Sequence, residues 1–317
     1  MQKIYFGAPG TGKSYEIDEF LRNNGVEDEN VFRVTFHPEY TYNDFVGQLI
    51  PKMEKLQNGE TVITYSFEKG QFTLALEKAY EDISKPVYLI IEEMSRGNCA
   101  AIFGDIFQLL DRVSEGVEKG FSRYFINNAI IAKDIIAITD DRVKLPPNLS
   151  ILGTVNTSDQ NVFVMDTAFK RRFEWEYIST KPVLSKDADS STKVYKNNVD
   201  IVLNDGKENI VIKWVDLYGV LNKFITSEKW LDLGEDKQIG QFFIEFTDPS
   251  QYQSQIKNKL LNYLWFDIIQ ASYKSDTRLF DEAISSFSDL YDRFDAGEKI
   301  FSDDFFNCIE SWKNNVL

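Results

Sequence analysis

The residues best suited to chemistry form a glycine-rich run near the amino end of the chain, Gly7-Ala8-Pro9-Gly10-Thr11-Gly12-Lys13-Ser14. The run matches the G-x-x-x-x-G-K-[ST] pattern in full, with an apolar stretch before it and helical spacing after it. Its glycines let the backbone turn several N–H groups toward phosphate oxygens. Lys13 would bring a cation to the β- and γ-phosphates, and the Ser14 hydroxyl would ligate Mg²⁺. A chance glycine-rich turn is the alternative, and the context argues against it, so the run predicts a nucleoside triphosphate site.

Two adjacent acids, Glu92 and Glu93, end the apolar run Val87–Ile91. In a phosphate-hydrolysing site the first acid supports the metal through its water shell, and the second polarises the attacking water. The first position usually holds aspartate, so Glu92 adds one methylene to the reach of the carboxylate. Two solvated acids at a strand end are the alternative.

A further apolar run, Ile151–Val155, leads into Asn156-Thr157-Ser158-Asp159. We expect this strand to lie between the two described above, so that Asn156 orients the lytic water. Asp159 would position that water or an arginine from a neighbouring subunit. Taken alone, these residues are also typical of a turn or a helix cap.

Two arginines, Arg171 and Arg172, follow Asp166 on a predicted helix. Their position suggests an arginine finger, which completes the site of a neighbouring subunit; Arg172 is the first candidate and Arg171 its alternate. A surface or salt-bridged pair is the alternative. Arg96, just after the acidic pair, is a second candidate for action across an interface.

Short apolar runs alternate with amphipathic stretches over residues 1–180. This order predicts an α/β domain with a parallel five-stranded sheet flanked by helices, interrupted by hairpin insertions near 52–66 and 114–145. Polar residues 181–212 are expected to form an insertion or linker, and 213–317 a small helical lid. The expected strands are Ile4–Phe6, Val31–Phe36, Val87–Ile91, Ile151–Val155 and Phe173–Ile178, and the expected helices of the first domain are Lys13–Asn23, Phe67–Ile83 and Ala100–Val113.

The composition narrows the possible functions. At 317 residues with 43% hydrophobic content, the chain can bury the cores of two folded domains. Its net charge of −15 argues against DNA binding through a broad basic face. Two distant cysteines, Cys99 and Cys308, predict no disulfide framework and fit a reducing cytoplasm. No apolar run approaches the roughly 20 residues of a membrane span, and the single histidine, His37, excludes a multi-histidine metal site.

The motifs together resemble the McrB family of AAA+ proteins. The resemblance rests on the phosphate loop, on Phe36–Phe45, on Ile90–Asn98, and on Asn156–Asp159 with Asp166–Phe173; it resumes weakly at Ile239-Gly240-Gln241-Phe242-Phe243, which is similar to the family's lid motif. It implies an AAA+ P-loop fold in a GTP-hydrolysing subunit of a modification-dependent restriction system. It also implies a ring, usually a hexamer, a nuclease partner of the McrC type, and DNA handled through the assembled complex. In that family the Asn-Thr-x-Asp signature, here Asn156 and Asp159, works with the partner to prepare the lytic water.

The chain departs from the family pattern at several positions. Gln160 stands where arginine is common, and no arginine lies beside Gly240. Only six residues precede the phosphate loop, so we expect the DNA-reading domain to be on another polypeptide or to have been removed. No Asn-Lys-x-Asp guanine motif is present; GTP is therefore implied by the resemblance alone, and ATP stays open. Two other functions also stay open: an ATP-driven remodelling protein of the MoxR or dynein-like branch, and a nucleotide-gated scaffold with little turnover. Taken alone, Phe36–Phe45 is expected to be loop and core packing.

Overall fold

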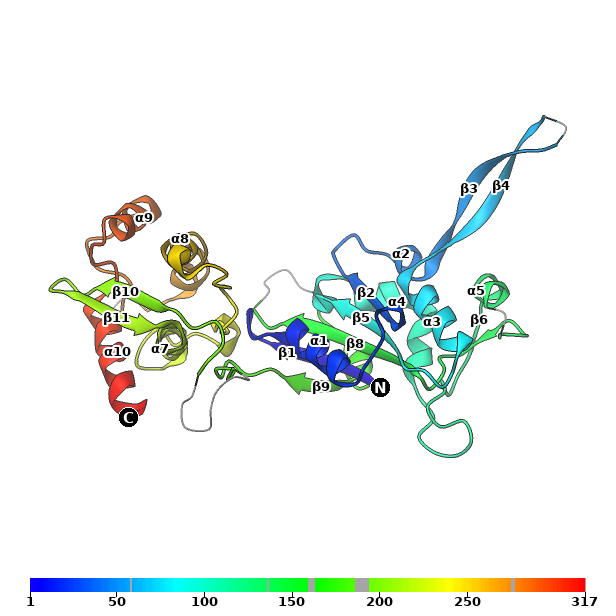
Figure 1. The fold of residues 1–317 in the computed structure, drawn as a ribbon, viewed down its shortest axis with the longest axis horizontal. Helices are drawn as coiled ribbons and strands as arrows, with labels where there is room; N and C mark the ends of the chain where they lie inside the picture. Colours follow the sequence, from blue (N-terminus) through cyan, green and yellow to red (C-terminus); the bar gives the residue numbers. More distant parts are fainter. Residues whose placement is uncertain (58, 136, 159–162, 186–193, 275–276, 317) are drawn as a thin grey trace. The chain divides into compact units, whose positions relative to one another are not determined.

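A computed structural model describes residues 1–57, 59–135, 137–158, 163–185, 194–274 and 277–316 (Figure 1). The chain forms two compact units. The first combines Met1–Phe6 with Lys13–Tyr177, and the second combines Gly7–Gly12 with Ile178–Leu317. The second unit thus begins close to the expected boundary at residue 180, but it also takes in most of the phosphate loop.

The first unit is built on a parallel sheet of five strands in the order β2-β5-β8-β1-β9. Their bounds are β1 Gln2–Gly7, β2 Val31–Thr35, β5 Val87–Glu92, β8 Leu149–Asn156 and β9 Glu174–Tyr177. All residues of Val87–Ile91 are buried. Because successive side chains of a strand point to opposite faces, both faces of the sheet are covered at β5. The predicted five strands and their layering are confirmed, and β8 lies between β5 and β1 as expected.

The helices confirm one prediction and correct two. Helix α1, Lys13–Asn23, has the predicted bounds. Helix α3 covers only Gln71–Glu81, because residues up to Lys69 belong to a strand and Gly70 caps the helix. The helix expected over 100–113 is short: α4, Cys99–Phe103, gives way to a 3₁₀ segment at Gly104, whose φ of 48° does not continue an α-helix.

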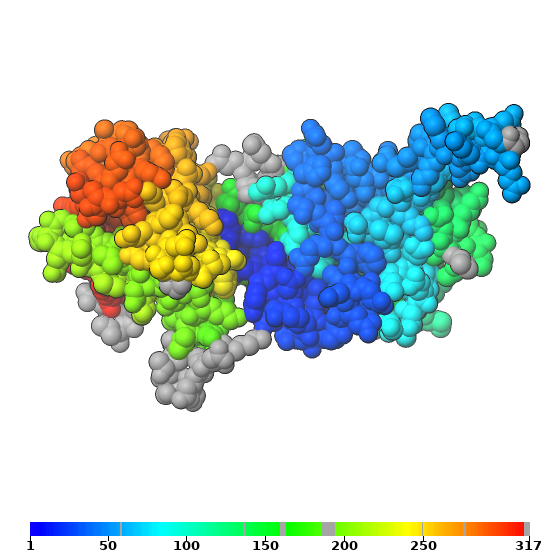
Figure 2. Space-filling view, turned by 45° about the horizontal axis from the view of Figure 1, so that its top comes forward, coloured from blue at the N-terminus to red at the C-terminus, as the bar shows by residue number. Residues whose placement is uncertain are grey.

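The first insertion is a longer hairpin than the turn signal predicted. Strands β3, Gly47–Lys55, and β4, Thr61–Lys69, pair along their whole length. Figures 1 and 2 show this hairpin standing off the rest of its unit. Leu49, Met53 and Ile63 share one face and are exposed. The apolar alternation that marked the hairpin in the sequence therefore faces solvent in the isolated chain.

The second insertion, between the 3₁₀ segment and β8, contains a short antiparallel pair. Strands β6, Ile126–Asn127, and β7, Arg142–Val143, flank helix α5, Ala129–Asp134. The expected hairpin at 114–145 is thus present in reduced form, with a helix between its strands.

Aromatic side chains from distant segments fill the core beside the sheet. Phe36, Phe45, Phe103 and Phe169 are all buried, and ring centroids lie 5.2 Å apart both between Phe45 and Phe103 and between Phe103 and Phe169. Helix α2, Tyr42–Val46, carries Phe45 into this cluster. The core-packing interpretation of residues 36–45 is therefore confirmed for Phe36 and Phe45.

The second unit is mostly helical, but it is not helical throughout. Residues 200–213 form the hairpin β10–β11, and its Ile201, Leu203 and Ile212 belong to this unit's core, so this part of 181–212 is no linker. The strands of this hairpin are β10 Asp200–Asn204 and β11 Asn209–Lys213. The helices of this unit include α7 Trp214–Thr226, α8 Tyr252–Gln255 with wider π-type turns after it, α9 Phe287–Asp295 and α10 Asp303–Val316. None of the helices in the described ranges of either unit is long and apolar enough to cross a bilayer.

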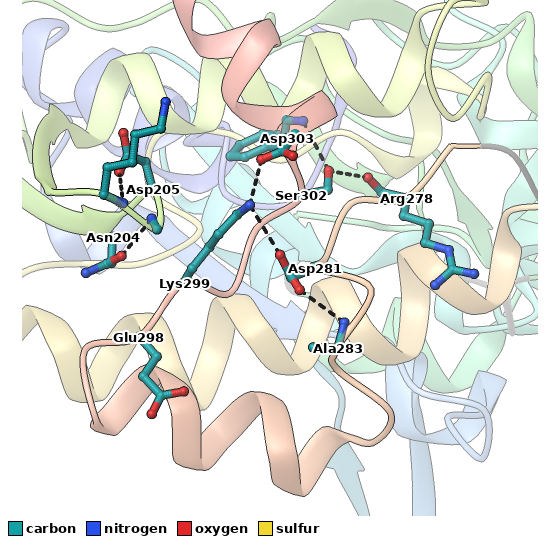
Figure 3. A network of polar contacts seen from close by, with 12 residues as sticks. Asn204, Asp205, Arg278, Asp281, Ala283, Glu298, Lys299, Ser302 and Asp303 are labelled. Atoms are coloured by element: carbon teal, nitrogen blue, oxygen red, sulfur yellow. Dashed lines mark hydrogen bonds and ion pairs between the residues drawn. The ribbon is translucent and has the colours of Figure 1, made fainter.

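A polar network ties the start of α10 to the segment before α9 (Figure 3). The Lys299 ammonium lies 2.6 Å from Asp303 and 3.3 Å from Asp281. The Asp281 carboxylate also accepts a hydrogen bond from the Ala283 N–H at 3.0 Å. Lys299 thus bridges two carboxylates that are 22 residues apart in sequence.

Candidate functional site

The phosphate loop has the local conformation that its glycines predict. It connects β1 to α1, and φ is 75° at Gly10 and 92° at Gly12, a region that disfavours residues with a Cβ. The Thr11 hydroxyl donates to the Ala8 carbonyl at 3.0 Å and closes the turn. Lys13, the first residue of α1, is 8% exposed. The strand–loop–helix context required for a phosphate loop is therefore present.

Glu92 ends β5 and accepts hydrogen bonds on both carboxylate oxygens. Its Oε2 receives the Ser14 hydroxyl at 3.0 Å and the Thr154 hydroxyl at 2.6 Å. Its Oε1 faces the Arg33 guanidinium at 2.5 Å. The two residues expected to serve magnesium, Ser14 and Glu92, are thus in direct contact.

Glu93 adopts a left-handed backbone conformation, with φ 54° and ψ 42°. This conformation is unfavourable for a residue with a Cβ and is often found at functional sites. The Asn156 amide nitrogen lies 2.9 Å from each Glu93 carboxylate oxygen. Arg96 pairs with the same carboxylate at 3.3 Å, within its own chain. The structure thus brings together the predicted water-polarising acid and the predicted water-orienting amide.

Two residues of this cluster were not predicted from the sequence. Buried Thr154 on β8 accepts the Glu93 N–H at 3.1 Å while it donates to Glu92, so one hydroxyl fixes both acids. Arg33 on β2 reaches Glu92 because β2 pairs with β5, with Thr35 opposite Glu92. A threonine or an arginine within a strand is ordinary, so only the strand order could have identified them.

The segment expected as a lid motif contacts the phosphate loop within the second unit. The Gly240 N–H donates to Pro9 O at 2.8 Å, and the Phe242 N–H donates to Gly10 O at 2.7 Å. A Cβ on Gly240 would lie 2.4 Å from the Gly10 carbonyl and from the Thr11 nitrogen. The approach of the two backbones therefore requires glycine at 240.

The two candidate arginines differ in their surroundings. Both follow helix α6, Thr167–Lys170, instead of lying on it. Arg172 makes a two-pronged contact with Asp111, at 3.1 and 2.7 Å, and its guanidinium lies 4.0 Å from the Phe107 ring centroid. Arg171 is exposed and has no ion pair with another described residue. Arg172 therefore has the structural role that the sequence offered as the alternative for the pair.

Arg171, Arg172 and Arg112 line one cavity of about 490 Å³. Arg112 donates only to uncharged oxygens among the described residues, including Leu149 O at 2.9 Å, and burial lowers its pKa to about 10. Leu149 and Asn156 are the two ends of β8, roughly 20 Å apart at about 3.3 Å per residue. The arginine cavity and the Glu93–Asn156 pair thus lie at opposite ends of the same sheet.

The residues present fit a magnesium–nucleotide site. The Ser14 hydroxyl donates a hydrogen bond to Glu92, so the lone pairs of its oxygen remain available for a cation. In the described ranges, no three side chains of His, Cys, Asp or Glu are grouped as a metal cluster. Magnesium commonly binds with few protein ligands, completed by water and substrate phosphates. Asp159, the remaining predicted site residue, lies outside the described residues.

The chain is similar in sequence to a domain family and to two known restriction enzyme components. Residues 4–173 match the family model of the AAA domain, dynein-related subfamily. The type II restriction enzyme BsuMI component YdiS of Bacillus subtilis is 34% identical over 323 residues, covering 95% of this chain and 88% of that protein. The type IV methyl-directed restriction enzyme EcoKMcrB subunit of Escherichia coli is 27% identical over 174 residues, covering 54% of this chain and 34% of that protein. A putative ATPase structure from Cytophaga hutchinsonii aligns with a TM-score of 0.34 and 15% identity, covering 59% of this chain and 43% of that one.

A sheet of this strand order, with a phosphate loop after its first strand and an acid pair at the end of β5, defines a P-loop nucleotide hydrolase of the AAA+ class. The chain belongs to the dynein-related AAA domain family, and within it the chain is an McrB-like subunit.

Proposed function

We propose that this chain is the nucleotide-hydrolysing motor subunit of a restriction system. The contact of Asn156 with both oxygens of Glu93 carries the proposal, because a mere scaffold has no use for a carboxylate held in a strained backbone beside a water-orienting amide. Both curated relatives are named as restriction enzyme components, one of type II and one of type IV. The proposal covers restriction of either type.

Each site residue has a proposed role. The backbone of Gly7–Gly12 cradles the phosphates, and Lys13 neutralises the β- and γ-oxygens. Ser14 and Glu92 hold Mg²⁺, which supplies charge neutralisation at the transferred phosphoryl group when bound. Glu93 takes the proton of the attacking water, and Asn156 fixes that carboxylate. Asp159, by resemblance, assists in positioning the water.

Catalysis is proposed to need a second copy of the chain. The cavity that Arg171 and Arg172 line is at the Leu149 end of β8, and this end lies roughly 20 Å from Asn156 at about 3.3 Å per residue, beyond the reach of an arginine side chain. They can act only on a nucleotide that another subunit presents to their cavity. This geometry supports a ring, and resemblance favours a hexamer. Arg171 is the preferred finger, because Arg172 is already neutralised by Asp111.

The remaining partners are proposed from the relatives and from charge. A nuclease subunit of the McrC type would stimulate hydrolysis and cut DNA. With a net charge of −15, the chain is expected to meet DNA through the assembled complex. GTP is favoured over ATP by resemblance to the McrB family.

The second candidate is an ATP-driven remodelling protein that acts on protein substrates. The match of residues 4–173 to the dynein-related subfamily supports it. The same hydrolytic residues would serve either function, so the nucleotide and the stimulating partner distinguish the two.

Steady-state phosphate release from GTP and from ATP tests the proposal, measured with and without the proposed nuclease subunit of the McrC type. We expect GTP turnover that the nuclease subunit raises and that the Glu93→Gln variant lacks. Turnover with ATP alone would reject GTP use and favour remodelling. The absence of turnover with either nucleotide, even with the partner, would favour a scaffold.

A further inference from the structure

Arg33 bridges two carboxylates beside the proposed magnesium site. Its Nη1 lies 2.5 Å from Glu92 Oε1, and its Nη2 pairs with Asp18 on α1. The Glu92 side chain is 14% exposed, whereas Arg33 and Asp18 are 37% and 49% exposed. The inner half of the bridge is therefore shielded from water, and the outer half is open to it.

The two oxygens of the Glu92 carboxylate have different partners. Oε1 contacts Arg33, while Oε2 accepts the hydroxyls of Ser14 and Thr154. The methylene that glutamate adds over aspartate extends the carboxylate, and Arg33 restrains this longer side chain. Without Arg33, Ser14 and Thr154 would still hold Oε2, but Oε1 would lose its partner and could turn toward a cation.

The three charged side chains of the bridge also contribute to the electrostatic potential of the site. Glu92 and Asp18 each carry −1 and Arg33 carries +1, so the group has a net charge of −1, the same as a single aspartate. Charges a few ångströms apart interact substantially even when they are partly screened. Removing the charge of Arg33 or that of Asp18 must therefore change the affinity of the site for a divalent cation, and the two changes must have opposite directions.

We propose that Arg33 is a positioning residue for Mg²⁺ use: it fixes Glu92 so that one oxygen faces Ser14, and together with Asp18 it limits how tightly the ion binds. This inference rests on the proposed function as a magnesium-dependent nucleotide hydrolase. The Arg33→Met variant changes the net charge of the three-residue group from −1 to −2, so it binds the ion more tightly but holds Glu92 less well. The Asp18→Asn variant leaves a net charge of zero, so it binds the ion more weakly.

The test is a Mn²⁺ titration followed by electron paramagnetic resonance, with the full-length protein and a non-hydrolysable nucleotide analogue. We expect Arg33→Met to bind Mn²⁺ about three- to tenfold more tightly and Asp18→Asn about three- to tenfold more weakly, the range expected for one partly screened unit charge. Arg33→Lys keeps the charge and should restore near-native affinity. Arg123→Met removes an exposed arginine elsewhere in the same unit, and should change nothing.

A second variant series separates positioning from folding. In a Glu92→Asp background the carboxylate is shortened away from Arg33, so adding Arg33→Met should change turnover far less than it does with Glu92 present. Opposite shifts in metal affinity, with this loss of coupling, support the inference. Affinities within twofold of wild type, or equal weakening in both variants together with a lower thermal midpoint, would overturn it. If the wild-type protein binds no metal–nucleotide at all, the proposed function itself fails.

Discussion

The Asn156 side-chain amide lies 2.9 Å from both carboxylate oxygens of Glu93. Asn156 ends β8 and Glu93 directly follows the end of β5, the adjacent parallel strand, so the strand order places the two residues together. A carboxylate that accepts from one amide on both oxygens has its plane fixed, and it presents its remaining lone pairs in set directions. Glu93 and Asn156 should therefore act as one unit in hydrolysis.

The first prediction tests that unit. Glu93→Gln should retain nucleotide binding and lower turnover by about 10²-fold or more, because it removes the general base. Asn156→Ala should lower turnover by about 10- to 100-fold, as expected for losing a hydrogen bond to a charged group. The double variant should be little worse than Glu93→Gln, because Asn156 acts through the carboxylate. Single-turnover phosphate release checks all three, with exposed Glu115→Gln as the control. Additive losses would mean that Asn156 works independently of Glu93.

The second prediction concerns Lys13. Lys13→Ala should weaken nucleotide binding strongly, because it removes the cation that neutralises the β- and γ-phosphates. Equilibrium titration with a fluorescent nucleotide measures the loss. Glu93→Gln is the matched control, since it changes charge at the same site and should bind normally. Unchanged affinity in Lys13→Ala would refute the assignment of the phosphate loop.

Much of this site could be predicted because its motifs are local in sequence. The loop residues, the acid pair and Asn156 each follow a short apolar run, and the alternating runs indicated a parallel sheet. What the sequence did not reveal depends on pairing between distant segments. Thr154 and Arg33 matter only because β8 and β2 flank β5, and the contact of Gly240 with the phosphate loop joins residues 230 positions apart. The helical spacing between Phe72 and Ile83 predicts a helix that begins at Phe67, but Phe67 pairs with Leu49 and is a strand residue.

The third prediction separates the two arginines. Arg171→Ala should leave stability unchanged and depress turnover only in assembled rings, because the side chain is exposed and acts on another subunit. Arg172→Ala should lower stability, since it leaves the Asp111 carboxylate without its partner and the Phe107 ring without its cation.

Mixing experiments check the role of Arg171. Arg171→Ala subunits mixed with Glu93→Gln subunits should regain some turnover, because some interfaces then combine an intact acid with an intact arginine. Thermal unfolding of each variant alone provides the control. If the mixtures recover nothing and Arg172→Ala behaves as predicted for Arg171, the assignment is reversed.

The fourth prediction concerns the contact between Gly240 and the phosphate loop. In Gly240→Ala the added methyl would lie 2.4 Å from backbone atoms of Gly10 and Thr11, so one backbone must move and the hydrogen bond to Pro9 must break. We expect nucleotide affinity to fall roughly tenfold, which corresponds in free energy to the loss of about one hydrogen bond. Gly234→Ala is the control, because its φ is −66° and the nearest atoms belong to Asp236. Equal affinity in the two variants would show that the contact does not shape the loop.

The last prediction uses the bridge of Lys299 between Asp281 and Asp303. The Ala283 N–H first, and Lys299 second, lower the pKa of Asp281, while the hydrogen bond to Asp303 raises the pKa of Lys299. A lowered carboxyl pKa stabilises the fold above the carboxyl's unfolded value, near pH 4, and this contribution is lost as pH falls through the folded value. A raised lysine pKa stabilises the fold below the lysine's unfolded value, near 10.5, and this contribution is lost as pH rises through the folded value.

Lys299→Met should therefore lower the free energy of unfolding by about 0.5–1 kcal/mol near pH 7, a size typical of partly exposed ion pairs. The difference from wild type should shrink as pH falls below about 4. Tryptophan fluorescence is a suitable readout, because Trp214, Trp230, Trp265 and Trp312 all lie in this unit. Lys259→Met provides the control: it is an exposed lysine of the same unit, with no ion pair to another described residue. A difference that persists unchanged as the pH falls through the lowered pKa of Asp281 would show that the lysine stabilises the unit through the packing of its methylene chain and not through its charge.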